Sequence, residues 1–308
     1  MFAPPRMIKA EVFARLPDKF RRAGTESDWL QKQLKSIGGG FPTHSFLEGP
    51  SFDRDGNLYC VDISYGRIFR VSPSGEFEVA AEYDGNPNGL KIHRDGRIFI
   101  ADNRRGVMVM DPASGAVESY CDRLALESFK GLNDLFFASN GDLYVTDMGQ
   151  SGLHDPSGGL YRLRADGGHD LLLNNVPGPN GLVMNLNESA LYLAATRLNT
   201  VWVCPLSRGD MPSKVGTFVH LNGGMGPDGL ALDSAGNLAV CHVGFGAVWL
   251  FSPRGEPLLR IEPPDGRFTS NLAYGGSDNR TLYITESSSG CILKAEMEVP
   301  GQTMFSHM

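Results

Sequence analysis

The sequence lacks basic tracts, and its acidic residues outnumber its basic ones. The 308 residues include 28 Lys and Arg against 35 Asp and Glu, a formal net charge of -7. Clustered Lys and Arg attract nucleic acids and anionic membranes, so this balance argues against both as partners. The chain has no run of about 18 apolar residues, and its first residues lack the apolar stretch of a secretory signal. We therefore expect a cytoplasmic protein.

Cysteine is scarce, and its spacing is uninformative. The five cysteines form no C-x-x-C pair and no metal-finger spacing. Three of them lie in apolar strand patterns, where buried free thiols are expected: Cys60, Cys204 and Cys241. The G-x-S-x-G motif is also absent, which disfavours a covalent serine hydrolase.

Glycine, by contrast, is abundant, with 38 residues that fall mostly in turns between apolar strands. A phrase of polar residue, apolar strand, tight turn and apolar strand recurs six times, at intervals of roughly 40 to 48 residues. This period matches one four-stranded propeller blade. We predict an all-β, six-bladed β-propeller with four-stranded antiparallel blades. The residues that open the six phrases are Glu48, Asn88, Asn133, Asn180, Asp228 and Asn271.

The two ends of the chain are expected to close the ring. Residues 8–16 alternate like a strand, and we predict that they form the outer strand of blade six beside residues 291–297. Residues 1–308 are then one domain.

Residues 17–47 form an insertion, for which we predict one short amphipathic helix. Thr25 is the expected N-cap, and Gly38 is the expected end. Because the insertion leads directly into Glu48, it ends at the face where the openers converge. It is either a lid over that face or padding on the surface.

The openers converge at one end of the central channel, which predicts a metal site. Glu48 and Asp228 would repel each other there, and a divalent ion removes that repulsion. Carboxylate and amide oxygens favour Ca²⁺, while Zn²⁺, Mn²⁺ and Mg²⁺ also suit the set. The alternative is that these side chains only bond turn backbones, and it is favoured for Asn88 and Asn271 taken alone.

The loops between second and third strands lie on the same face as the openers. Four residues on these loops are candidates for binding substrate: Asn103, His154, Arg197 and His242. For the two histidines the alternative is a ring bonded to loop backbone, and for Arg197 it is an exposed side chain without a role.

Four phrases carry a family resemblance, namely EGPSFDRDGNLYCVD, GLNDLFFASNGDLYVTD, PNGLVMN and GPDGLALDSAGNLAV. They are similar, in order and over residues 48–290, to motifs of the SMP-30/gluconolactonase/luciferin-regenerating family of six-bladed propellers. The resemblance implies a lactonase with a metal ion on the propeller axis. Its metal-binding residues correspond to Glu48, Asn180 and Asp228, and a further Asn that lines the site corresponds to Asn133.

The resemblance also implies that Asp228 is the general base, and we expect Glu48 to be a catalytic residue as well. Some family members have an Arg that contacts sugar hydroxyls two residues before the site-lining Asn, but this chain has Gly131 there. The expected substrate is a small lactone of the sugar or hydroxy-acid type, and the protein is expected to be a monomer or dimer. Two alternatives are a non-enzymatic propeller with a structural axial metal and a related esterase or phosphotriesterase.

Overall fold

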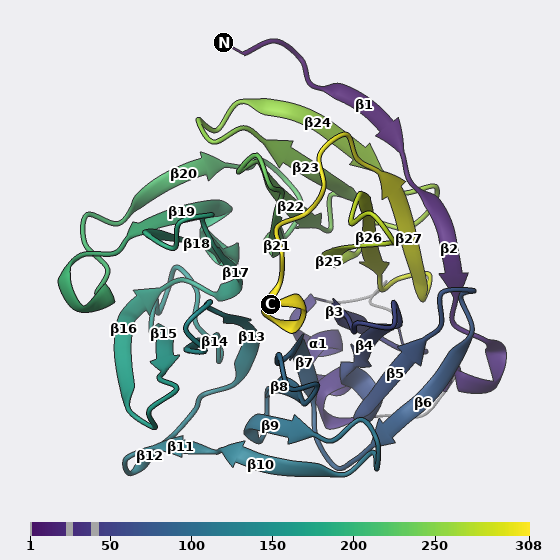
Figure 1. Cartoon of the computed structure of the whole chain (residues 1–308), viewed down its shortest axis with the longest axis horizontal. Helices are drawn as coiled ribbons and strands as arrows, with labels where there is room; N and C mark the ends of the chain where they lie inside the picture. Colours follow the sequence, from purple (N-terminus) through teal and green to yellow (C-terminus); the bar gives the residue numbers. More distant parts are fainter. Residues whose placement is uncertain (1, 23–26, 38–42) are drawn as a thin grey trace.

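The computed structural model describes residues 2–22, 27–37 and 43–308. Six antiparallel sheets surround a central axis, with the first strand of each sheet innermost, as Figure 1 shows. The predicted six-bladed propeller is confirmed. The innermost strands contact one another around the ring in chain order, and the last of them contacts the first.

The blades are as follows, from the inner strand outward. Blade one has β3 (Leu47–Phe52), β4 (Leu58–Asp62), β5 (Arg67–Val71) and β6 (Phe77–Glu82). Blade two has β7 (Pro87–Ile92), β8 (Ile98–Asp102), β9 (Gly106–Met110) and β10 (Val117–Cys121). Blade three has β13 (Leu132–Phe137), β14 (Leu143–Asp147), β15 (Gly158–Leu163) and β16 (His169–Val176). Blade four has β17 (Pro179–Met184), β18 (Ala190–Ala195), β19 (Thr200–Pro205) and β20 (Gly216–His220). Blade five has β21 (Gly226–Leu232), β22 (Leu238–Val243), β23 (Ala247–Phe251) and β24 (Pro257–Glu262). Blade six has β25 (Thr269–Gly275), β26 (Thr281–Glu286) and β27 (Cys291–Glu296).

Tight turns join the first and second strands on one face of the ring. In blade one the Asp53 carboxylate accepts the backbone N–H groups of Asp55 and Asn57 at 2.9 and 2.8 Å. Gly56 has φ 80°, a left-handed value that glycine adopts without steric cost. The polar turns alternate with strands that pack between neighbouring blades, where the apolar core lies.

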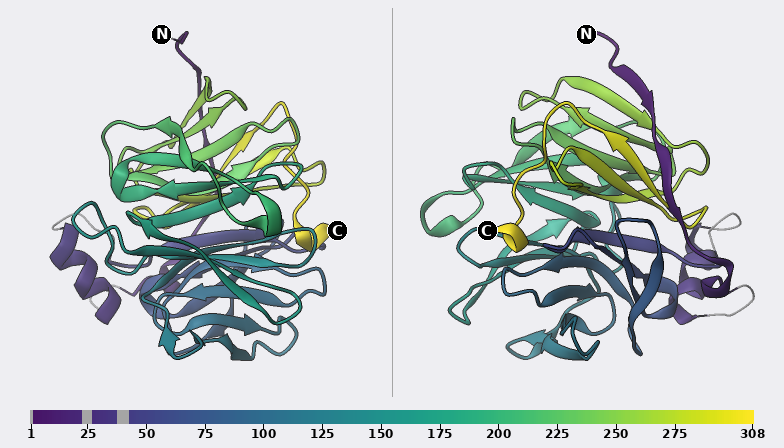
Figure 2. Two further views of the ribbon diagram at one scale, coloured as in Figure 1. Left: turned by 90° about the vertical axis from the view of Figure 1, so that its left-hand side faces the viewer. Right: turned by 45° about the vertical axis from the view of Figure 1, so that its right-hand side comes forward.

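The N-terminal strands close the ring, as Figures 1 and 2 show. β2 (Glu11–Arg15) pairs antiparallel with β27, so the predicted outer strand of blade six is confirmed. β1 (Arg6–Lys9) pairs parallel with β24 and makes blade five a five-stranded sheet, which the alternation of residues 8–16 did not predict. The break between the two strands falls at Ala10, whose N–H donates to the carbonyl of Glu262.

The insertion contains α1 (Asp28–Ile37), the predicted short helix. The Ser27 hydroxyl accepts the N–H of Leu30 at 3.1 Å and so caps the helix. The predicted cap at Thr25 and end at Gly38 lie outside the described residues. Trp29 and Leu30 pack in one apolar cluster with Phe46. None of the helices in the described part of the chain is long and apolar enough to cross a membrane.

The remaining elements are short. A two-stranded hairpin follows blade two, and five 3-10 turns complete the fold: β11 (Arg123–Leu124), β12 (Glu127–Ser128), η1 (Asp18–Phe20), η2 (Ile63–Tyr65), η3 (Thr196–Leu198), η4 (Arg208–Asp210) and η5 (Phe305–His307). Figure 2 shows α1 and η5 on opposite faces of the propeller. A mostly apolar cavity of about 620 Å³ lies on the face of η5, with Lys91 and Phe136 among its lining residues.

Candidate active site on the propeller axis

Five of the six predicted openers take equivalent places at the start of the innermost strands. The strand register shows this, because each lies three residues before the inner-strand residue that pairs with one equivalent residue of the second strand, namely Tyr59, Phe99, Tyr144, Tyr192 or Ala239. In blade six the equivalent residue is Tyr283, which lies three residues before Glu286 as Tyr59 does before Asp62. Tyr283 pairs with Ala273, and the residue three places before Ala273 is Ser270. The opener assigned to Asn271 is therefore off by one position. The five equivalent residues are all buried: Glu48, Asn88, Asn133, Asn180 and Asp228.

Asn271 instead occupies a position that is glycine in four blades and aspartate in one. A Cβ atom on Gly229 would lie 2.2 Å from Asn271 Oδ1, and one on Gly89 would lie 2.5 Å from Asp134 Oδ1. These glycines thus leave the room that the two polar side chains take up. Asp134 was not among the predicted site residues. Its signal was the Asn-Asp pair at 133–134, because four of the other five phrases have glycine at the second of these positions.

A chain of polar contacts crosses the channel at this level. Asn271 Nδ2 donates to Glu48 Oε2 at 2.8 Å and to Asp134 Oδ2 at 3.3 Å. Glu48 Oε2 also accepts the N–H of Gly49 at 2.7 Å. On the other side, Lys91 Nζ lies 3.8 Å from Asp134 Oδ1. Two carboxylates, from blades one and three, are thus linked through Asn271, and the second of them faces the buried ammonium group of Lys91.

Burial and mutual repulsion shift the pKa values of two of these acids. Burial, followed by the charge of Asp134, raises the pKa of Glu48 to about 7, against opposing hydrogen bonds from Gly49, Asn271 and Ser270. Burial, followed by the charges of Glu48 and Asp134, raises the pKa of Asp228 well above its usual value. A hydrogen bond from Asn180 and the charge of Arg197 act in the opposite direction. The structure therefore brings Glu48, Asn180 and Asp228 together.

This donor set suits a hard divalent ion. The described residues contain no group of three His, Cys, Asp or Glu side chains placed to hold a metal by themselves. The predicted set needs no such group, because it combines two carboxylates with the amide oxygen of Asn180. Neither Glu48 nor Asp228 forms an ion pair within the described part of the chain. Two adjacent buried acids without such a partner are stabilised by a cation.

The other predicted residues lie around this cluster in different environments. Asn133 Nδ2 donates to Met148 Sδ at 3.7 Å, and Asn103 Nδ2 donates to the carbonyl of Leu132 at 3.5 Å. Arg197 is exposed, and its charge reaches Asp228. His154 is also exposed and neighbours Gly152, close to the Arg197 side chain.

His242 lies near the end of β22 and bonds groups of neighbouring segments. It is 1% exposed, and burial is the main reason that its pKa is lowered. Its Nε2 bonds the carbonyl of Gly223 at 2.8 Å, and its Nδ1 accepts from Trp249 Nε1 at 3.3 Å. The ring stacks on Phe245 with centroids 4.7 Å apart. These contacts favour the alternative in which the histidine is bonded to loop backbone.

In four other blades an acid ends the second strand at the place that His242 takes in blade five. These carboxylates accept backbone N–H groups from the segment that leads into their own blade, for example Phe46 to Asp62 at 2.8 Å and Gly131 to Asp147 at 2.7 Å. They fix the loops and the entry to the inner strands, and so they position the openers. The four acids are Asp62, Asp102, Asp147 and Glu286.

The fold and the axial cluster define a class of protein, a six-bladed propeller with buried acidic and amide side chains at one end of its axis. Residues 46–288 match the SMP-30/Gluconolactonase/LRE-like region, and the chain belongs to this family.

Two sequence relatives carry lactonase names. A gluconolactonase from Zymomonas mobilis is 29% identical over 272 residues, covering 78% of this chain and 76% of that protein. Lactonase drp35 from Staphylococcus epidermidis is 30% identical over 265 residues, covering 78% of each. Both support the prediction that the chain is an enzyme of the lactonase type.

Solved structures share the fold. A gluconolactonase from Xanthomonas campestris superposes with a TM-score of 0.73 at 20% identity, covering 98% of this chain and 99% of that one. Regucalcin from Agrobacterium tumefaciens, described as a calcium-binding protein, superposes with a TM-score of 0.73 at 23% identity, covering 85% and 94%.

Proposed function

We propose that the protein hydrolyses the ring ester of a small lactone with the help of one divalent ion on the propeller axis. Glu48, Asn180 and Asp228 are the residues that would hold the ion, and Ca²⁺ suits their hard oxygen atoms best. The observation that carries the proposal is the burial of Glu48 and Asp228 at the axis, where the charge of Glu48 raises the pKa of Asp228 and neither acid has an ion-pair partner among the described residues. A divalent ion bound there polarises an ester carbonyl and makes water a better nucleophile.

Residues of the chain would supply the proton transfer and the orientation of the substrate. Glu48 is fixed, because Oε2 accepts from both Gly49 and Asn271. Asp228 has no such pair of clamping donors in the described structure, so its carboxylate is the better placed to accept a proton from water. Asn133 borders the cluster and orients the substrate or water, and Asn88 lies beside it as a further substrate contact. Burial of the whole cluster excludes bulk water and strengthens these interactions.

The substrate is bound at the face where the loops of blades two to four meet. Arg197 and His154 are exposed there, and Asn103 lies beside Gly131. A Cβ on Gly131 would lie 2.8 Å from Asn103 Nδ2, so the Asn103 amide takes the space next to this backbone. Cationic and amide donors suit a hydroxylated or carboxylated lactone. We further propose that the insertion of residues 17–47 acts as a lid over this face. We also propose that the protein is cytoplasmic.

Removing and restoring the ion tests this function. Protein treated with EDTA is expected to lose hydrolysis of aldonolactones and hydroxy-acid lactones, followed as proton release in a pH-stat. Ca²⁺, Mn²⁺, Mg²⁺ or Zn²⁺, added one at a time, is expected to restore it. Turnover of aryl esters or phosphotriesters but of no lactone would assign the site to another hydrolase. Ion binding without any turnover would indicate a structural metal in a non-enzymatic propeller.

A further inference from the structure

Lys91 is an unusual residue for its place in the propeller. It lies on β7 and pairs with Phe99 of β8. The inner-strand residues at the same level of the other blades are all uncharged: Ser51, Phe136, Val183, Ala231 and Ala273. Lys91 is only 9% exposed, although a lysine is almost never so buried without a partner. A buried ammonium group at the axis thus calls for an explanation.

Its contacts connect it to the axial acids. Lys91 Nζ donates to the carbonyl of Leu90 at 3.1 Å and lies 3.8 Å from Asp134 Oδ1. The same Oδ1 accepts the N–H of Leu135 at 2.8 Å. Asp134 Oδ2 is bonded by Asn271, which also bonds Glu48. Lys91 therefore acts on Asp134 directly and on Glu48 only through two intervening side chains.

The charges of this cluster add up to a definite value. Glu48, Asp134 and Asp228 contribute three negative charges when ionised, and Lys91 contributes one positive charge, which leaves -2. Arg197 is exposed, so solvent screens its effect. A charge of -2 is matched by one divalent ion. Without Lys91 the same acids would carry -3, which a single divalent ion would not neutralise.

We propose that Lys91 is a positioning residue that neutralises Asp134 and thereby sets the axial site for a single divalent ion. This inference rests on the proposed function, because it assumes that an ion binds at Glu48, Asn180 and Asp228. Asp134 then belongs to the pair with Lys91, while Glu48 and Asp228 remain for the ion. Lys91 selects the charge of the ion without touching either the ion or the substrate.

A series of variants that differ in the net charge of the axial site tests this inference. Lys91→Met gives -3, Asp134→Asn gives -1, and the double variant Lys91→Met/Asp134→Asn restores -2. Lys91→Arg keeps the wild-type charge. Calorimetric titration of each full-length, EDTA-treated protein with Ca²⁺ and with Tb³⁺ measures affinity and stoichiometry without any need for turnover. The preference for Tb³⁺ over Ca²⁺, relative to wild type, is the quantity to compare.

We expect the preference for Tb³⁺ to rise about tenfold or more in Lys91→Met and to fall by a similar factor in Asp134→Asn, because buried charges interact strongly at low effective dielectric. The double variant and Lys91→Arg should stay within about threefold of wild type. A merely structural role for Lys91 would weaken both ions alike in Lys91→Met.

The outcomes separate this inference from the function on which it rests. One Ca²⁺ bound by wild type, with an unchanged preference in Lys91→Met or an unrestored one in the double variant, overturns the role of Lys91 alone. If Lys91→Met does not fold, the comparison of Asp134→Asn with the double variant decides the question in the same way. Wild-type protein that binds no divalent ion overturns both the metal site and this inference.

Discussion

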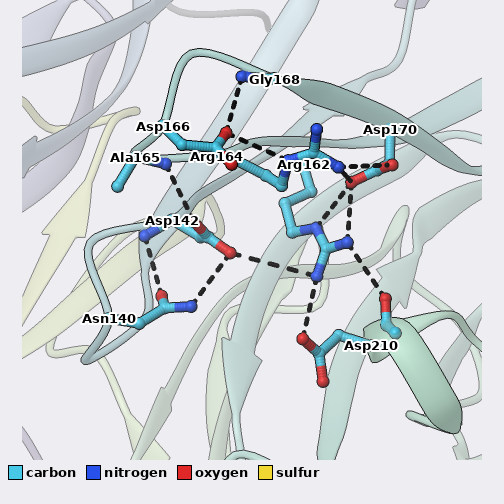
Figure 3. Close-up of polar contacts among 10 residues, drawn as sticks. Asn140, Asp142, Arg162, Arg164, Ala165, Asp166, Gly168, Asp170 and Asp210 are labelled. Atoms are coloured by element: carbon cyan, nitrogen blue, oxygen red, sulfur yellow. Dashed lines mark hydrogen bonds and ion pairs between the residues drawn. The ribbon is translucent and has the colours of Figure 1, made fainter.

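Two acidic clusters in this protein are built in opposite ways. Around the axis lie Glu48, Asp134 and Asp228, and among the described residues only Asp134 of the three forms an ion pair, with Lys91 at 3.8 Å. Between blades three and four, as Figure 3 shows, three aspartates surround the guanidinium group of Arg162. Arg162 donates twice to Asp170, at 2.9 and 2.7 Å, and once to Asp210, at 3.2 Å. It also lies 4.0 Å from Asp142.

The Arg162 cluster satisfies its own acids. Asp142 Oδ1 accepts the N–H of Ala165 at 2.9 Å, and Arg164 adds a second guanidinium group to Asp170 at 3.3 Å. In the axial cluster, by contrast, the charges of Glu48 and Asp134 act on Asp228, and they are opposed by a hydrogen bond from Asn180 and the charge of the exposed Arg197. The first arrangement stabilises the fold by itself, whereas the second would, under the proposed function, be completed by a bound cation. Acids without local compensation thus distinguish a binding site from a structural network.

The largest expected effect is on catalysis. Asp228→Asn keeps the size of the side chain but removes its charge and its basicity, so lactone hydrolysis should fall about a thousandfold or more. Initial rates in a pH-stat measure this, with far-ultraviolet circular dichroism as the check on folding. The matched control is Asp170→Asn, which changes an acid of the self-compensated cluster and should leave turnover per folded molecule unchanged. Wild-type rates in Asp228→Asn would remove this residue from the site.

The next effect is on stability. Arg162→Met leaves three aspartates without their shared guanidinium group, and the free energy of unfolding should fall by about 3 kcal/mol. Urea unfolding measures it. Arg164→Met is the control, because Arg164 is 38% exposed in its side chain and should contribute less than about 1 kcal/mol. Equal losses in the two variants would contradict the view that Arg162 organises this cluster.

The smallest effect concerns pH. In the metal-free folded protein the pKa of Glu48 is raised to about 7 from its usual value of 4.5. Between these two pH values the folded state keeps the proton on Glu48, whereas the unfolded chain has lost it. The stability of EDTA-treated protein should therefore fall as the pH rises through this range. A saturating ion removes the penalty, so Ca²⁺ should raise the melting temperature by about 5 °C at pH 8 and by less than half of that at pH 5.5. A shift that is as large at pH 5.5 would argue against ion binding at these carboxylates.

Much of the fold could be predicted from the sequence because the blades repeat. Alternating apolar residues and glycine turns specify each strand locally, and the period of the repeat specifies the ring. Residues 8–16 also alternate clearly enough to predict the outer strand of blade six. That β1 joins blade five depends on a break at Ala10, where the backbone bonds Glu262, and alternation alone does not encode such a change of partner.

The site was harder to predict in detail. The repeat identified five equivalent openers, but in blade six a one-residue ambiguity favoured Asn271 over Ser270, because serine is a less distinctive residue at that place. Asp134 and Lys91 were not predicted as site residues. Each departs from the repeat, but only the three-dimensional structure shows that the two side chains lie next to each other at the axis. His242 was selected for its loop position, yet its ring bonds Gly223 and stacks on Phe245, contacts that no spacing in the sequence reveals.

The N-terminal segment has a mechanical consequence. Residues 6–15 are one continuous backbone stretch whose hydrogen bonds belong first to blade five and then to blade six. Pulling these two blades apart along the circumference must shear one ladder or the other, so this seam resists opening more than a simple overlap within one blade would. Asp228 lies on β21 of blade five and Asn271 on β25 of blade six, so a seam that resists opening also limits how far these two inner strands can move apart.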